Sequence, residues 1–171
     1  MKRAVCILAI SILAACGSAG TGTGTDDSID TSASATARSL VAISNAPDRS
    51  FASMLNSVRS VNGAAPVTYD SRLGVAAQRH ADDMLAGNFF SHTGSDGSTV
   101  GTRVTAAGYN WQRVGENIGR GQDDEEDILR AWVNSSGHQA NNVDPRFEDF
   151  ALAKAGTGSQ QYWVLVLARE F

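Results

Sequence analysis

Three side chains in the second half of the sequence could together carry out metal or acid–base chemistry. Glu116 stands in the segment VGENIGRG (residues 114–121), where a single carboxylate lies among glycines that permit close backbone approach. His92 and His138 each follow the end of an expected helix, in loops that display polar groups over a rigid scaffold. Two neutral imidazoles and one carboxylate could hold zinc with an open position, or could form a hydrogen-bonded acid–base set without metal. The spacing along the chain leaves both chemistries open.

Other arrangements that support catalysis are absent from the sequence. It has no Gly-x-Ser-x-Gly, no His-Glu-x-x-His and no glycine-rich phosphate loop with a following lysine. Ser135 and His138 are three residues apart, but nothing in the sequence orients them as nucleophile and base. His80 falls on the inward face of an expected helix, which favours a hydrogen-bonded core role over a ligand role. The acidic run 123–127 is typical of a first helical turn, and it lacks the alternating acids and the glycine of a calcium loop.

Two helices are expected before His92. The first is capped by Asp48, ends at Asn62-Gly63 and carries one apolar face, formed by Phe51, Met54, Leu55, Val58 and Val61. The second begins after Asp70 or Ser71 and stops at Gly87, with an inward face of Leu73, Ala77, His80, Ala81, Met84 and Leu85. Residues 88–98 are expected to form a loop with a turn at 95–97, and residues 99–107 a short helix closed by Gly108.

The remaining elements follow the acidic run. A helix carrying Ile128, Leu129, Trp132 and Val133 is expected to close at Gly137. Two strands, about 149–155 and 161–168, are joined by a hairpin at 156–160. The second strand is apolar on both faces, so it should be covered on both sides. Helices together with an antiparallel sheet predict an α+β layered domain.

The N-terminus predicts export and a lipid anchor. Lys2 and Arg3 precede an apolar stretch, residues 4–15, that is shorter than the roughly 20 residues of a membrane span and fits a signal peptide (residues 1–15). The sequence Leu-Ala-Ala-Cys-Gly at 13–17 resembles a bacterial lipobox, in which Cys16 carries the lipid, although an ordinary cleavage site containing a cysteine would look similar. We therefore expect the protein on the extracytoplasmic side of the cell envelope, at the outer membrane if the host has one, or secreted.

The composition divides the rest of the chain into two parts. Residues 16–47 are rich in Gly, Ser, Thr, Ala and Asp and are expected to form a flexible, lipid-anchored linker, so the folded domain should span 48–171. The only other cysteine, Cys6, leaves with the signal peptide, which excludes a disulfide in the domain. The formal net charge of −4 argues against a nucleic-acid partner.

Several short motifs, in this order, resemble the CAP superfamily (cysteine-rich secretory proteins, antigen 5 and pathogenesis-related proteins) in its short bacterial, SCP-like form. They cover about residues 50–171 and are Leu73-(x)3-Ala77-(x)2-His80-Ala81-(x)2-Met84, Phe90-Ser91-His92, Arg103-(x)4-Gly108-Tyr109, Gly115-Glu116-Asn117-Ile118, Trp132-(x)2-Ser135-x-Gly137-His138 and Tyr162-Trp163. The resemblance implies a three-layer α-β-α sandwich with a small, three-stranded antiparallel sheet. It also implies a cleft that carries two histidines and two acids.

Residue by residue, the resemblance assigns His92, Glu116 and His138 to that cleft. The second acid of many eukaryotic members corresponds to Ser135, so the site is reduced to His-Glu-His, and the usual Gly-His-Arg is Gly-His-Gln, with Gln139. The favoured hypothesis is a non-catalytic binding domain whose cleft takes a divalent metal such as Zn²⁺, or a lipid, glycan or peptide. A metal- or histidine-dependent, peptidase-like hydrolase is one alternative, and a purely structural envelope protein is the other.

Overall fold

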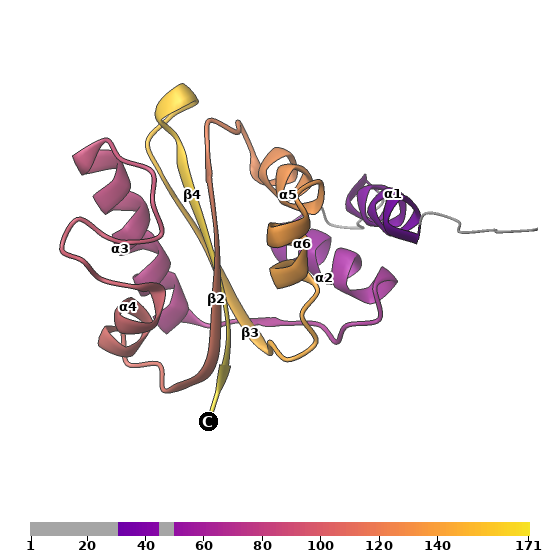
Figure 1. Ribbon diagram of the computed structural model, residues 1–171, viewed down its shortest axis with the longest axis horizontal. Helices are drawn as coiled ribbons and strands as arrows, with labels where there is room; N and C mark the ends of the chain where they lie inside the picture. Colours follow the sequence, from indigo (N-terminus) through magenta and orange to yellow (C-terminus); the bar gives the residue numbers. More distant parts are fainter. Residues whose placement is uncertain (1–30, 45–49) are drawn as a thin grey trace, which may run out of the picture.

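The computed structural model describes residues 31–44 and 50–171 (Figure 1). Its elements, in chain order, are α1 (Thr31–Ser44), α2 (Phe51–Val61), β1 (Thr68–Tyr69), α3 (Ser71–Gly87), α4 (Val100–Ala106), β2 (Trp111–Arg120), α5 (Glu125–Val133), α6 (Ser136–Asn142), β3 (Asp149–Ala155), a 3-10 turn (Gly158–Gln160) and β4 (Tyr162–Glu170).

The elements form three layers. One four-stranded sheet, in the order β1-β3-β4-β2, lies between α3 and α4 on one face and α1, α2, α5 and α6 on the other (Figure 1). Strands β2, β4 and β3 are antiparallel, as the resemblance implied, and the two-residue β1 adds a parallel fourth strand beside β3. The predicted α+β class and three-layer α-β-α sandwich are confirmed.

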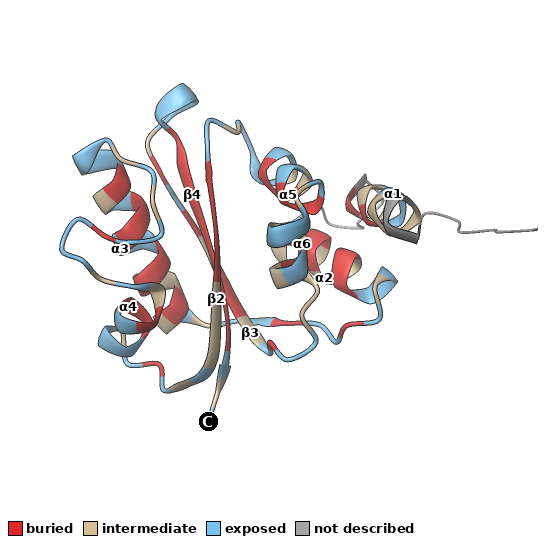
Figure 2. Cartoon of the chain, viewed as in Figure 1, coloured by how far each residue is buried: buried red, intermediate tan, exposed pale blue. Residues whose placement is uncertain are grey.

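The central strand β4 builds two cores at once. Its side chains alternate, so that Trp163, Leu165 and Leu167 pack with α2 and α5 while Val164 and Val166 pack with α3. All residues from Tyr162 to Ala168 are buried, which makes β4 the most continuously buried strand of the sheet (Figure 2). The prediction of a strand covered on both sides is confirmed, because a strand with apolar residues on both faces needs a helix layer against each.

Helix caps set the ends of most helices close to their predicted positions. Asp70 accepts a hydrogen bond from the backbone of Arg72 at the start of α3, and Asp124 accepts one from the backbone of Asp127 at the start of α5. The cap of α2 is Ser50, and the expected cap Asp48 lies outside the described residues. The acidic run begins helix α5, as expected. The expected turn at 95–97 also forms and is closed by a hydrogen bond from the backbone N–H of Gly97 to the carbonyl of Gly94.

Several details of the sequence-based prediction are wrong. Val61 and Leu85, expected inside, are 42% and 37% exposed, so the buried face of each helix is narrower than predicted. Gly137 does not end α5, which stops at Val133, and instead lies in α6. The strand β2 was not predicted at all, because its glycines interrupt the alternation of apolar and polar residues that marks a strand.

Residues 31–44, expected within the flexible linker, form helix α1 packed against α2 and α5. Ile43 and Ser39 are completely buried, and Asn62 donates a hydrogen bond to the Ser39 hydroxyl over 2.9 Å. The segment is polar on average, but a few of its apolar residues lie on one helical face. The helix becomes stable when this face packs against other helices. The signal peptide, Cys16 and the linker up to residue 30 lie outside the described residues. Within the described ranges, no helix combines the length and apolarity needed to cross a membrane.

Candidate functional site

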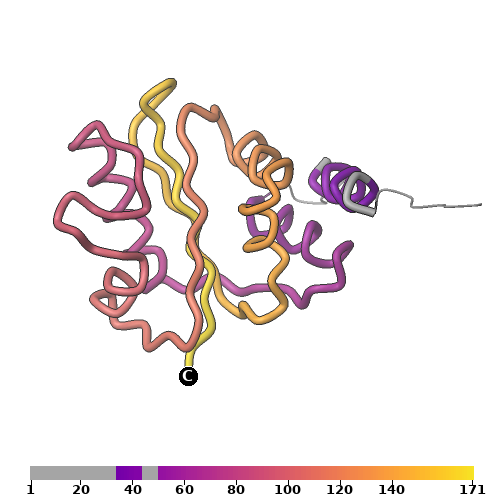
Figure 3. Tube along the Cα trace, in the orientation of Figure 1, coloured from indigo at the N-terminus to yellow at the C-terminus, as the bar shows by residue number. Residues whose placement is uncertain are grey.

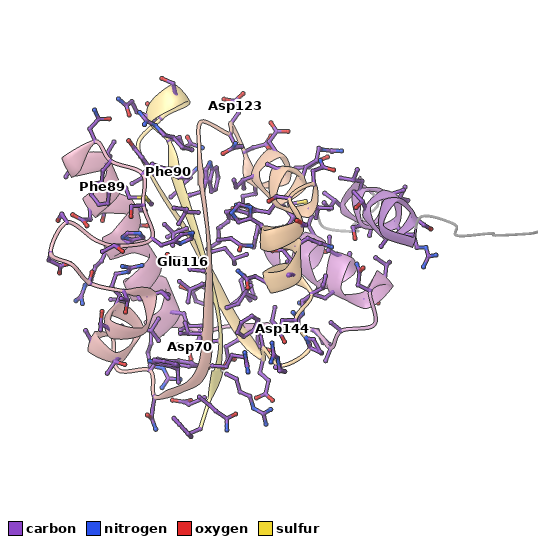
Figure 4. All side chains as sticks on the ribbon, viewed as in Figure 1. Asp70, Phe89, Phe90, Glu116, Asp123 and Asp144 are labelled. Atoms are coloured by element: carbon purple, nitrogen blue, oxygen red, sulfur yellow. The ribbon has the colours of Figure 1, made fainter. Side chains whose placement is uncertain are left out.

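The carboxylate of Glu116 is the centre of a buried ion-pair cluster. Glu116 lies on β2 with only 2% of its side chain exposed, near the middle of the molecule in Figure 4. Nδ1–H of His92 donates to its Oε1 over 2.8 Å, and Nη2 of Arg103 donates to its Oε2 over 2.7 Å. The burial of an acid among glycines is thus explained by a cation that neutralises it.

Arg103, in α4, joins this carboxylate to the loop that carries His92. Its guanidinium also donates to the backbone carbonyls of His92, over 3.2 Å, and of Ser98, over 2.9 Å. The planar fork of an arginine suits this role, because several donors are held in one fixed geometry. The loop is therefore held at both the backbone and the imidazole of His92.

His80 lies in the core, as predicted, rather than in a ligand-binding position. Its side chain is fully buried, Nε2–H donates to the carbonyl of Ser91 over 2.9 Å, and the same nitrogen is 4.0 Å from Oε1 of Glu116. Burial lowers the pKa of His80, which keeps the ring neutral near pH 7. Its role is to hold the backbone next to His92.

His138 lies on the opposite side of β2 from the Glu116 carboxylate. Successive side chains of a strand point to opposite faces, so Asn117 points toward α6 and donates to the backbone carbonyl of His138 over 3.1 Å and to Asn142 over 3.0 Å. Nδ1 of His138 is 2.8 Å from the hydroxyl of Ser135. Burial, and then repulsion from His92, lower the pKa of His138, whereas the hydrogen bond to Glu116 raises the pKa of His92.

Both His92 and His138 line one cleft of about 620 Å³ beside β2. Its apolar part is formed by Ile118, Ile128, Ala131, Trp132 and Phe90, and its polar part by Ser91, His92, Arg120, Gln122, Ser135 and His138. Gly119 is also in the lining, and a side chain there would collide with Ile128. Glu116 and Arg103 are not in the lining, so the ion pair supports the cleft without facing it.

The structure does not gather His92, Glu116 and His138 into one set of metal ligands. The part of the chain that the structure describes contains no group of three or more His, Cys, Asp or Glu side chains that could hold a metal ion. Glu116 uses one oxygen on Arg103 and the other on His92, and its side chain is only 2% exposed and does not line the cleft. The chemistry of this carboxylate is therefore that of an orienting partner for His92.

The same geometry separates the parts of a catalytic triad. In a Ser-His-Asp triad, the serine, the histidine and the acid form one hydrogen-bonded chain. Here Ser135 contacts His138, whereas the acid, Glu116, contacts His92. The serine–histidine contact, which the sequence left undecided, is real, but it is not backed by the carboxylate.

Comparison with known proteins identifies the family of this chain. The sequence profile described as the "Cysteine-rich secretory protein family", CAP, matches residues 52–167. The chain belongs to the CAP family. The resemblance drawn from the short motifs is confirmed, and the CAP match begins at α2, so that α1 precedes it.

Relatives of this CAP domain occur in bacteria. YkwD of Bacillus subtilis is 27% identical over 140 residues, covering 78% of this chain and 54% of YkwD. The B. subtilis membrane protein YlbC is 27% identical over 97 residues, covering 57% of this chain and 28% of YlbC. This chain therefore spans about half of these relatives' length or less.

Two solved structures share the CAP fold. An extracellular protein with an SCP domain from Bacillus anthracis superposes with a TM-score of 0.64 at 23% identity, over 88% of this chain and 45% of that one. An outer surface protein from Borrelia burgdorferi gives a TM-score of 0.64 at 17% identity, over 70% of this chain and 89% of that one.

Two residues beside His92, Glu116 and His138 have roles that were not predicted from the sequence. Arg103 was noted in a motif, but nothing in the sequence marked it as the counter-ion of Glu116. Asn117 was noted only as the neighbour of Glu116, yet it ties β2 to the helix of His138. If β2 had been predicted as a strand, the alternation of its side chains would have placed Glu116 and Asn117 on opposite faces of the sheet.

Proposed function

We propose that this CAP domain is a non-catalytic binding module of the cell envelope, which holds a ligand in the cleft between His92 and His138. One observation carries the proposal: the cleft has an apolar interior and two histidines at its wall, while the only acid of the predicted site is neutralised outside it. A site built in this way recognises a ligand by shape and a few polar contacts. Among the described residues that line the cleft, none has a carboxylate that could act as a general base.

The lining points to an amphipathic ligand. Phe90, which is 49% exposed, and the exposed Ala131 offer apolar surface, and Arg120 and the two imidazoles offer polar contacts at the same cleft. A lipid, a glycan with apolar sugar faces or a short peptide each combine these properties. All three occur in the envelope, and binding measurements with one probe of each class separate them.

Location at the envelope is part of the same proposal. The lipobox-like segment predicts a lipid on Cys16 that anchors the protein to a membrane on the extracytoplasmic side. Among the structural neighbours, one protein is described as extracellular and another as an outer surface protein, which supports this location.

Zinc binding is retained in a narrower form, with His92 and His138 as the protein ligands. The Nδ1 atoms of both rings form hydrogen bonds within the protein, so the Nε2 atoms are the ones that would bind zinc in the cleft. Glu116 would then orient His92 rather than bind the metal, as acids behind metal-bound histidines commonly do. A zinc titration by calorimetry on the full chain and on His138→Ala tests this: loss of saturable binding in the variant supports the site, and equal binding contradicts it.

The ligand class can be tested by NMR with three probes: dihexanoyl phosphatidylcholine, an N-acetylglucosamine tetramer and trialanine. Saturable shifts in the amides of residues 118–120 and 131–138 are expected with one probe class. Ala131→Trp fills the cleft and should abolish those shifts. Ala140→Trp is the matched control, because Ala140 is also an exposed helical alanine but does not line the cleft. Shifts that persist in Ala131→Trp would disprove binding in the cleft.

One observation favours a hydrolase as the second candidate. The Glu116–His92 pair resembles the acid–histidine part of a hydrolytic site, and Nε2 of His92 could take a proton from water. Such an enzyme would release amines from a mixed peptide library, with a rate that falls at least a hundredfold in His92→Ala. Release at the same rate by the variant, or none by the parent, would exclude this function.

A further inference from the structure

The helix that the sequence did not predict, α1, forms with α2 a shallow apolar groove at the outside of the molecule. The groove has a volume of about 550 Å³ and is lined by Ser34, Ala37, Arg38, Val41, Ala42 and Val61. Val41 is 58% exposed and Val61 is 42% exposed, although removing their apolar surface from water would be favourable in free energy. Figure 3 shows α1 as the outermost element of its layer, on the side away from α3.

The charges around the groove differ from those of the rest of the chain. The protein has 18 acidic residues, but the sequences of α1 and α2 contain none. Arg38 lies in the groove itself. The acidic first turn of α5 lies at the other end of α2, where Glu125 accepts a hydrogen bond from the backbone of Phe51. Within α1 and α2, this face therefore presents one cation and no carboxylate to a bilayer.

The position of α1 in the chain identifies that surface. Residues 17–30 join Cys16, the proposed lipid attachment site, to α1, and even fully extended they would span only about 50 Å. The first helix after the anchor is therefore never far from the bilayer. A tether of this length raises the effective concentration of a weak contact to about the millimolar range.

From these observations we propose that the α1–α2 groove docks the domain onto the anionic bilayer that holds its lipid anchor. This inference rests on the lipid anchor of the proposed function. The apolar patch is too small to hold the protein on a membrane without the anchor, so docking occurs only in the tethered protein. The groove residues are separate from those that line the cleft, so docking leaves the cleft free for its ligand.

Hydrogen exchange on a tethered protein tests the proposal. The polypeptide beginning at Cys16 has a single thiol, which can be coupled either to a maleimide lipid in phosphatidylcholine–phosphatidylglycerol vesicles or to a soluble maleimide cap. On vesicles, the amides of α1 and of the end of α2 should exchange at least threefold more slowly than with the soluble cap. Vesicles of phosphatidylcholine alone should give a smaller effect.

Paired variants give the control. Val41→Asp with Val61→Asp should remove the slowing, whereas Val75→Asp, at a similarly exposed valine on α3, should retain it. Exchange in β4 reports whether each variant is folded. Equal exchange on vesicles and with the soluble cap would overturn the proposal, as would slowing that rises with protein density, which indicates a second copy as the occupant. Because the lipid is coupled chemically, these results do not depend on whether cells modify Cys16, which mass spectrometry of the protein from a bacterial host tests separately.

Discussion

Oε2 of Glu116 lies 2.7 Å from Nη2 of Arg103, and the two side chains are only 2% and 8% exposed. Removing one partner of a buried pair leaves an uncompensated charge, which typically costs about 3–5 kcal/mol. We expect Arg103→Met to lower the free energy of unfolding by about that amount in urea titrations. The double variant Arg103→Met with Glu116→Gln should recover a large part of the loss. Equal losses in the single and double variants would mean that the pair contributes through packing alone.

The three histidines should titrate in a fixed order. The hydrogen bond to Glu116 raises the pKa of His92 above its ordinary value, and burial lowers the pKa of His80 and of His138. NMR of the ring protons should therefore show His92 protonating first as the pH falls. In Glu116→Gln the pKa of His92 should move down toward the others. An unchanged pKa for His92 would contradict the contact with Glu116.

The raised pKa of His92 also sets the sign of a stability effect. Because the folded protein holds this proton more tightly than the unfolded chain, the contribution is fully present below about pH 6.5 and is lost as the pH rises through the folded pKa. The His92 side chain is 58% exposed, so solvent screening keeps the effect small. The difference in unfolding free energy between the parent and His92→Gln should therefore be larger at about pH 5.5 than at about pH 8.5. A difference that grows with pH would have the wrong sign.

Gly119 is required by the packing of the cleft. A Cβ there would collide with Cδ1 of Ile128 and lie 3.1 Å from Oε1 of Gln122. Gly119→Ala should cost about 1–3 kcal/mol of stability through overpacking, and Ile128→Val in the same chain should restore part of it. Gly137→Ala is the control, since a Cβ at this position in α6 meets nothing within 4 Å and should stabilise the helix by up to about 1 kcal/mol. Thermal unfolding of the variants measures these changes.

Arg59 joins α2 to the backbone at the end of α6 and just after it through hydrogen bonds. It is fully buried and donates to the backbone carbonyls of Ala65, Asn142, Asp144 and Phe147. Arg59→Met would leave these carbonyls without their donor, at a total cost of about 3 kcal/mol or more. Arg146→Met, which removes an exposed ion pair, should cost far less in the same denaturant series. Similar losses for the two variants would refute the structural role of Arg59.

Local sequence patterns determined most of the elements. The helix of residues 71–87 and the strands at 149–155 and 162–170 follow from apolar periodicity, from the cap Asp70 and from the unbroken apolar run of β4. The acids before Ile128 determined the start of α5 for the same reason, because the groups that satisfy a helix terminus lie next to it in the chain.

The tertiary structure alone decided where α1, β1, β2 and α6 form and what the site residues do. Helix α1 and strand β2 have weak patterns of their own and become stable only against α2, α5 and β4, elements that the local sequence of each does not contain. The sequence brought His92, Glu116 and His138 together as candidates, but the pleat of β2 turns Glu116 to one face and Asn117 to the other. The acid therefore meets Arg103 and His92, while His138 is held from the opposite side. Such pairings depend on which faces of distant elements meet, and spacing along a chain does not contain that information.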